Sequence, residues 1–310
     1  MPLVNATGVR NWTPDRLTDL TGKRYLITGG NSGIGLEAAK MLAERNADVV
    51  IGARNATKGA TAVAAIESLG TGSAEMLQID LADMTSIRSA AEEAKPRFGT
   101  LSALINNAGI MQTPKQQTRD GFEMQLGTNH LGHFLWTALM IGQVDPAQGR
   151  IVTVSSIAHK YGKIHFDDLM LDKSYDPSAS YFQSKLANLL FAQELHRRLI
   201  ASGSHIKSVA CHPGYSDTEL QSTGPTGFLN ALYKFTNALM AQPGKLGAYP
   251  TVLSAAGDEA ISGAYYGPTG LMDMRGPVGD SYVEPRALDE AVAQRLWQVS
   301  EELVGDRLVV

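Results

Sequence analysis

Tyr181 and Lys185 are the two residues whose types and spacing first suggest chemistry, in the stretch SASYFQSKLAN. A phenol can exchange a proton with a carbonyl or alcohol oxygen, but its unperturbed pKa of ~10 is too high for this near neutral pH. A nearby ammonium group favours the phenolate, and residues at i and i+4 share one helix face. The pair could therefore be a tuned proton donor, but an ordinary helix face could carry the same two residues, and this spacing alone does not decide between them.

A glycine-rich turn supplies a second chemical signal, because YLITGGNSGIGLEAAKML has the pattern of a strand, a turn and the start of a helix. Its glycines have the spacing Gly-x-x-x-Gly-x-Gly, which permits a tight turn and a close approach of the backbone to a pyrophosphate at the helix N-terminus. A turn without a ligand is the alternative. We predict cofactor contacts from Gly29, Asn31, Ser32, Gly33, Ile34 and Gly35.

The end of the second strand, in VVIGARNATK, indicates which dinucleotide binds. A carboxylate there would accept a hydrogen bond from the ribose 2′-hydroxyl of NAD, but Asp48 lies too early, at the start of the strand. The end position carries Arg54, with Lys58 one turn into the next helix. Two cations suit a 2′-phosphate, so NADP(H) is predicted; a solvated surface pair is the alternative.

Further polar or small residues follow other predicted strands. Asp80 could accept from an adenine amino group or cap the next helix. Asn107, in LINNAG, is as well suited to a structural role as to a ligand contact. In HPGYSDT, Pro213 and Gly214 end a strand and shape a loop over the nicotinamide. The remaining predicted cofactor contacts are Leu81, Ala108, Gly109, Ser216 and Thr218.

The elements that must position these residues alternate along the chain. Continuous apolar runs separated by helical segments at 33–45, 57–69, 84–97, 122–142 and 179–202 are typical of a parallel sheet covered on both faces. We predict one Rossmann-type doubly wound α/β domain over 21–310, after an irregular arm at 1–20. The sheet is expected to have about seven strands, the last at 263–268, and a final helix lies near the C-terminus.

Composition narrows the class of protein. The 310 residues are 44% hydrophobic and 19% charged, with a net charge of −4. This balance lacks the excess of basic residues that is typical of proteins that bind nucleic acid or an anionic membrane. Cys211 is the only cysteine, and we find neither a signal-peptide run nor the ~18 apolar residues of a membrane span. A cytoplasmic protein is expected. His130 and His133 lack a third ligand of suitable spacing, so no metal is expected.

Seven motifs in order resemble those of the classical short-chain dehydrogenases/reductases, over roughly residues 22–268. They are TGGNSGIG, DL at 80–81, NNAG, NHLGHF, VSS, YFQSK and HPGYSDT. GAR followed by KG at 58–59, IAHKYGKIHFDDL and SKLANLLFAQEL are similar to the retinol dehydrogenase-like branch. That branch mostly uses NADP(H), but a retinoid substrate is not implied.

The resemblance implies roles for four catalytic residues. Tyr181 would be the general acid/base, and Lys185 would tune it and hold the nicotinamide ribose. Ser156, favoured over the competing Ser155, would donate to the substrate oxygen. Asn129 would perturb its helix and hold a water that links Lys185 to solvent. Ser156 and Tyr181 are 25 positions apart, further than in many family members, but this branch carries a similar insertion.

The sequence predicts an enzyme that interconverts a ketone or aldehyde and an alcohol, using NADP(H), on a small-to-medium apolar substrate. An enoyl reductase and a non-catalytic nucleotide sensor are the alternatives. A lid is expected at about 216–250, where apolar residues could cover the substrate or simply pack on the body. By resemblance, Thr218 is favoured over Ser216 as a cofactor contact. Apolar faces of helices 122–142 and 179–202 indicate a homodimer or homotetramer.

Overall fold

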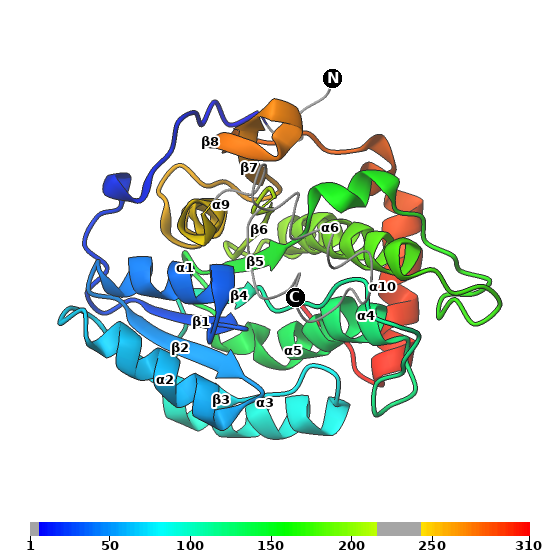
Figure 1. Cartoon of the computed structure of the whole chain (residues 1–310), viewed down its shortest axis with the longest axis horizontal. Coiled ribbons are helices and arrows are strands. Elements are labelled where there is room, and N and C mark those ends of the chain that lie inside the picture. The colour runs from blue at the N-terminus through cyan, green and yellow to red at the C-terminus, as the bar shows by residue number, and fades with distance from the viewer. Residues whose placement is uncertain (1–5, 216–242) are drawn as a thin grey trace.

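A computed structural model describes residues 6–215 and 243–310 and contains one eight-stranded sheet (Figure 1). The strand order is β3-β2-β1-β4-β5-β6-β7-β8, and all neighbouring pairs are parallel except β7 and β8. The doubly wound parallel sheet predicted from the sequence is therefore confirmed. The strands are β1 (Arg24–Thr28), β2 (Asp48–Ala53), β3 (Ser73–Gln78), β4 (Ala103–Asn106), β5 (Arg150–Val154), β6 (Lys207–Cys211), β7 (Tyr265–Gly270) and β8 (Arg275–Asp280).

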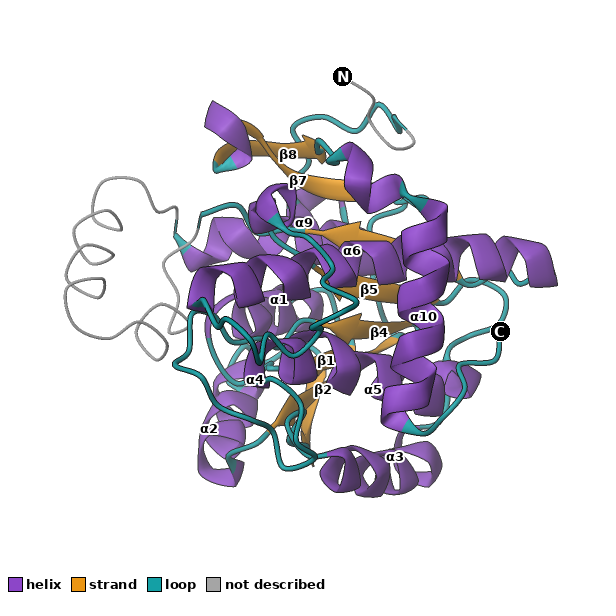
Figure 2. Ribbon diagram, turned by 90° about the vertical axis from the view of Figure 1, so that its right-hand side faces the viewer, coloured by secondary structure: helices purple, strands orange, loops and turns teal. Residues whose placement is uncertain are grey.

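Helices cover both faces of the sheet (Figure 2), and its inner strands are accordingly buried along nearly their whole length. One core cluster joins the sheet to α1 (Gly33–Ala43), α2 (Ala56–Glu67) and α9 (Gly244–Ala256). The opposite cluster joins it to α3 (Met84–Phe98), α5 (Gly132–Met140) and α6 (Pro177–Ser202). The last helix, α10 (Glu290–Val304), packs against α6.

The eighth strand was not predicted from the sequence. Its residues, RGPVGD, include two glycines and a proline and only one buried large apolar side chain, Val278. Proline is tolerated there because β8 is the edge strand and pairs antiparallel with β7. The arm that follows Thr7 reinforces this edge: the Trp12 amide donates to the Val278 carbonyl at 3.0 Å, and the indole ring is buried.

The single helix predicted over 122–142 is interrupted. A short α4 (Met124–Leu126) leads into a π turn over Gly127–Leu131 before α5 begins. The turn contains Asn129, whose side chain is completely buried. Wide turns of this kind occur frequently at functional sites, and this one lies against α6.

The connections place the predicted site residues beyond the carboxyl ends of the strands. From β1 the chain moves outward through β2 to β3, then returns to pair β4 with the other side of β1. The strand order reverses between β1 and β4, which is where ligands bind in open α/β sheets, outside the carboxyl ends of the strands.

Candidate active site

The turn after β1 has no room for side chains at two of its glycines. Gly29 has φ +68°, and a Cβ there would lie 3.0 Å from the Cα of Ala108. A Cβ on Gly35 would lie 2.4 Å from the Gly29 carbonyl oxygen. The turn is therefore as tight as the glycine spacing predicted, and it brings the start of α1 against the loop after β4.

The N-terminus of α1 differs from those of four other helices. Side chains of Asn55, Asp83, Asp176 and Asp289 accept hydrogen bonds from the first-turn amides of α2, α3, α6 and α10. Ser32, at the corresponding position of α1, makes no such bond within the described chain. Uncapped first-turn amides at the switch point suit an anionic group such as a pyrophosphate.

The two predicted cations lie where the sequence pattern placed them. Arg54 directly follows β2, with 76% of its side chain exposed, and its guanidinium is 4.0 Å from the Asp80 carboxylate. Lys58 is exposed in the first turn of α2. Asp80 also accepts from the Ala82 amide at 3.0 Å, so it shapes the turn after β3 and faces Arg54 at the same time.

Thr28, which sequence analysis did not single out, and His133, which it considered only as a metal ligand, hold the loops after β1 and β4 together. The Thr28 hydroxyl oxygen accepts from the amides of Asn107 (3.0 Å) and Ala108 (3.1 Å). The Nε2 atom of His133 lies 2.8 Å from the Thr28 hydroxyl oxygen, and its Nδ1 donates to the Asn129 carbonyl at 3.0 Å. The Asn107 side chain donates to the Thr28 carbonyl, which is the structural role left open for it.

The Tyr–Lys pair lies on α6. Lys185 is 3% exposed, and its Nζ is 5.8 Å from the centroid of the Tyr181 ring and 3.3 Å from the Val154 carbonyl. Burial lowers the pKa of Lys185 to about 8. Tyr181 is half-buried. The structure thus brings together the two side chains that the i, i+4 spacing paired.

The side-chain amide of Asn129 makes hydrogen bonds to the loop after β4 and to α6. Its Oδ1 accepts from the Ile110 amide at 2.8 Å, and its Nδ2 donates to the Ile110 carbonyl and to the Ser184 hydroxyl, both at 2.9 Å. A Cβ built on Gly109 would lie 3.2 Å from Asn129 Oδ1 and 3.4 Å from Lys185 Nζ. Asn129 and Lys185 therefore converge on the loop after β4.

The two serines after β5 have different surroundings. The Ser155 hydroxyl is buried and donates to the Lys185 carbonyl at 2.7 Å, so its proton is already used. Ser156 is half-buried, and its hydroxyl oxygen accepts from the Ala158 amide at 3.2 Å. A hydroxyl that accepts one hydrogen bond keeps its own proton to donate, which favours Ser156 as the contact with a substrate oxygen.

The loop after β6 is described only as far as Tyr215. Gly214 adopts φ +69°, and the Tyr215 amide donates to the Met274 carbonyl at 2.7 Å. Pro213 and Gly214 therefore end the strand beside the β7–β8 hairpin. Ser216 and Thr218, and most of the expected lid at 216–250, lie outside the described residues; the described end of that interval begins α9.

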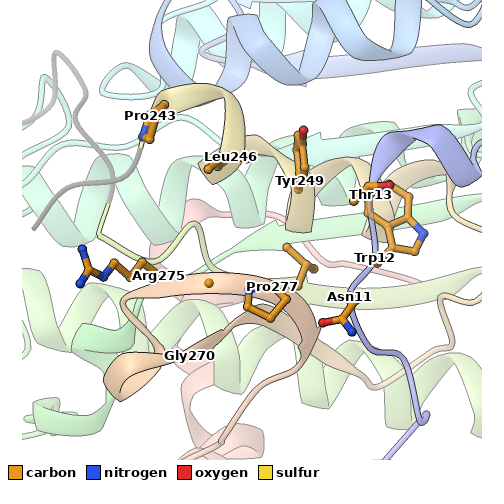
Figure 3. A pocket seen from close by; sticks show the side chains of 11 residues that line it. Asn11, Trp12, Thr13, Pro243, Leu246, Tyr249, Gly270, Arg275 and Pro277 are labelled. Atoms are coloured by element: carbon orange, nitrogen blue, oxygen red, sulfur yellow. The ribbon is translucent and has the colours of Figure 1, made fainter.

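A groove of about 680 Å³ lies between the N-terminal arm, the start of α9 and the β7–β8 hairpin. Figure 3 shows Trp12, Tyr249 and Pro277 among the side chains that line it. Its lining contains none of the Ser, Tyr and Lys residues predicted to be catalytic.

His130 and His133, considered above as metal ligands, have other partners. His130 Nε2 lies 2.9 Å from the Ser300 hydroxyl, and both His133 nitrogens are hydrogen-bonded. Burial lowers the pKa of His130 to about 3 and that of His133 to about 4. Over residues 6–215 and 243–310, no three His, Cys, Asp or Glu side chains are grouped to bind a metal, and no helix is both long and apolar enough to span a membrane.

Comparison with known proteins defines the family of this chain. The family model for short chain dehydrogenases matches residues 23–226. Human retinol dehydrogenase 11 is 39% identical over 291 residues, covering 92% of this chain and 87% of that protein. Human retinol dehydrogenase 12 is 41% identical over 293 residues, covering 93% and 88%.

Solved structures agree. An uncharacterised protein from Mycobacterium paratuberculosis superposes with a TM-score of 0.81 at 37% identity, covering 97% of this chain and all of that one. A short chain dehydrogenase from Burkholderia cenocepacia, in complex with NADP, has a TM-score of 0.63 at 27% identity over 80% of this chain and 96% of its own. The chain belongs to the short-chain dehydrogenase/reductase family, and its relatives lie in the retinol dehydrogenase-like branch. It is an oxidoreductase of a family that uses nicotinamide cofactors.

Proposed function

We propose that this protein is an NADP(H)-dependent oxidoreductase that interconverts an apolar ketone or aldehyde and the corresponding alcohol, with Tyr181 as general acid/base. The observation that carries the proposal is the buried Lys185 with its Nζ 5.8 Å from the Tyr181 ring, beside the π turn of Asn129. Relatives named as retinol dehydrogenases support an apolar substrate.

Each side chain has a distinct part in the reduction. Ser156 donates its hydroxyl proton as a hydrogen bond to the carbonyl oxygen and stabilises the charge that develops there. Tyr181 transfers its phenolic proton to that oxygen, and the positive charge of Lys185 stabilises the phenolate that remains. Asn129 keeps the loop after β4 against α6. The bound cofactor supplies or accepts the hydride.

The residues around the switch point suit the proposed cofactor. The pyrophosphate would lie on the uncapped N-terminus of α1, against Gly29 and Gly35. The 2′-phosphate would lie beside Arg54, which follows β2, and Lys58, in the first turn of α2. A neighbouring family structure that holds NADP is consistent with this preference.

A spectrophotometric screen of NADPH oxidation tests the function, with retinal, hexanal, benzaldehyde, acetophenone and an α,β-unsaturated ketone as substrates. Turnover of aldehydes or ketones is expected. Reduction of only the carbon–carbon double bond would favour the enoyl reductase, and NADPH binding without turnover of any compound would favour a nucleotide sensor. The cytoplasmic location and the homodimer or homotetramer stay predictions from the sequence.

A further inference from the structure

His159, three residues after Ser156, has both ring nitrogens hydrogen-bonded and no exposed surface. Its Nδ1 lies 2.6 Å from the Ser156 carbonyl oxygen, and the Glu284 amide donates to its Nε2 at 3.2 Å. A carbonyl requires a donor and an amide requires an acceptor, so the ring is the neutral tautomer protonated at Nδ1. Burial lowers the pKa of His159 to about 4, which agrees with this protonation state at neutral pH.

A second buried histidine, His212, makes the corresponding contacts with opposite polarity. Its Nδ1 accepts from the Gly214 amide at 3.1 Å, so in the neutral ring Nε2 carries the proton and donates to the Ser281 hydroxyl at 2.7 Å. The Tyr265 ring contacts both imidazoles, with centroids 5.4 Å from His159 and 5.2 Å from His212. The loops after β5 and β6 are thus both attached to residues 281–284, which follow β8.

The attachment at His159 acts on the one residue of its loop that is assigned to the substrate. The Ser156 carbonyl accepts both the His159 amide, at 3.1 Å, and the imidazole Nδ1–H. Fixing this carbonyl fixes the peptide plane after Ser156, and with it the turn in which the Ser156 hydroxyl oxygen accepts from Ala158. The direction of the remaining hydroxyl proton therefore depends on where the imidazole holds that peptide.

We propose that His159 is a positioning residue for the reaction, which aims the Ser156 hydroxyl by anchoring its peptide to the segment 281–284. This inference rests on the proposed function, because it assigns His159 a role only through Ser156. It also gives the segment after β8 a part in substrate chemistry, through the Glu284 amide.

Two substitutions separate the two hydrogen bonds of the ring. In His159→Asn, the amide nitrogen stands near the position of Nδ1 and can still donate to Ser156. In His159→Gln, the amide group stands near Nε2 and can accept from Glu284, while the bond to Ser156 is lost. We expect His159→Gln to lower kcat on the order of 10- to 100-fold, as for a small misplacement of a reacting group. His159→Asn should lose only a few-fold, and NADPH affinity should be unchanged in both.

A double-mutant cycle with Ser156→Ala distinguishes positioning from general damage. If His159 acts through Ser156, adding His159→Gln to Ser156→Ala lowers kcat no further. Losses that multiply would overturn the inference while leaving the proposed function intact. Full activity of Ser156→Ala alone would instead remove Ser156 from the proposed mechanism.

The anchor can also be weakened from the other side, without touching residue 159. Glu284 has φ −65°, the value that proline imposes, so Glu284→Pro removes the amide donor without a change in φ and places the proline Cδ against the imidazole, which displaces the ring from its anchored position. Glu284→Ala is the matched control, since it deletes the side chain but keeps the amide. A several-fold lower kcat is expected for the proline variant alone, and equal kcat values in the two variants would contradict the anchoring role.

Hydrogen exchange gives a readout that needs no substrate. In the NADPH-bound protein, peptides spanning 155–162 should exchange faster in His159→Gln than in wild type or His159→Asn, while peptides of α10 should exchange equally in all three. Unchanged exchange over 155–162 in His159→Gln would overturn the inference, even if no substrate were known.

Discussion

The loops after β1 and β4 and the loops after β5 and β6 are held by different kinds of contact. On the cofactor side, the Thr28 hydroxyl oxygen accepts hydrogen bonds from the backbone amides of Asn107 and Ala108, at the end of the adjacent strand. The side-chain amide of Asn107 in turn donates to the Thr28 carbonyl. On the substrate side, buried neutral imidazoles of His159 and His212 attach each loop to residues 281–284. The first set joins neighbouring strands, whereas the second reaches across to the end of the sheet.

This difference shows which parts of the site can vary independently. The loops after β1 and β4 are fixed to each other by contacts of Thr28, Asn107 and the buried His133, all of which precede β5 in the chain. The loop that carries Ser156 depends on the segment after β8 through His159, so changes there can alter the contact with the substrate oxygen while leaving the loops at Gly29 and Asn107 in place. Substitutions on the two sides should therefore have different effects on turnover and on cofactor affinity.

Tyr181→Phe is expected to give the largest effect, and only on the substrate side. The ring remains but the transferable proton is lost, so kcat should fall by roughly 10²- to 10⁴-fold. The dissociation constant of NADPH, measured by fluorescence titration, should stay within a few-fold of wild type.

Tyr161→Phe is the matched control, because Tyr161 is 69% exposed and loses the same hydroxyl group. It should retain wild-type kcat. Near-normal turnover of Tyr181→Phe would remove Tyr181 from the role of general acid/base.

Arg54→Asp is expected to act on the cofactor side alone. It replaces a cation beside the proposed 2′-phosphate by an anion, so NADPH should bind on the order of 10- to 100-fold more weakly, the range for a lost hydrogen bond to a charged group. NADH, which lacks the phosphate, should bind nearly as before.

Arg97→Asp serves as the control for this charge reversal, since Arg97 lies in the last turn of α3 and pairs with Glu75 and Glu93. It should leave the NADPH to NADH affinity ratio unchanged. If Arg54→Asp also leaves that ratio unchanged, Arg54 does not read the 2′-phosphate.

The sheet could be predicted from the sequence where its strands are buried on both faces. Such strands read as continuous apolar runs, and these identified β1 to β6 and, less sharply, β7. The edge strand β8 could not be identified, because an edge needs neither apolar residues on both sides nor a full set of amide donors. The π turn at Gly127–Leu131 also leaves no mark in apolar periodicity; only the family resemblance indicated that Asn129 would perturb its helix.

Residue type and spacing identified the candidate catalytic and cofactor residues better than the residues that hold them in position. The pairing of Tyr181 with Lys185 follows from helix geometry. The tight turn leaves no room for a side chain at Gly29 or Gly35, and the glycine spacing in the sequence indicated such a turn. Thr28, His133 and His159 each have at least one partner distant in the chain, and a residue's type does not reveal such a partner. The only indication that these residues matter was that they lie in the motifs TGGNSGIG, NHLGHF and IAHKYG, respectively. A motif does not show which atom a side chain contacts.

The support of the cofactor side can be measured with two buried threonines. Thr28 in β1 and Thr153 in β5 are each 1% exposed, but their hydroxyls differ. Thr28 accepts from two amides, while the Thr153 hydroxyl has no hydrogen-bond partner within the described residues. Valine has nearly the shape of threonine without the hydroxyl, so the same substitution isolates the hydrogen bonds.

Thr28→Val should lower the free energy of unfolding by about 2 kcal/mol, the typical cost of leaving buried amides unpaired, as measured by urea denaturation. Thr153→Val removes a polar atom that has no partner, so the protein should be equally or more stable. Thr28→Val should also weaken NADPH binding, because the Asn107–Ala108 loop loses its anchor beside Gly29. Equal losses of stability in the two variants would mean that strand packing, and not the Thr28 hydroxyl, holds the cofactor loops in place.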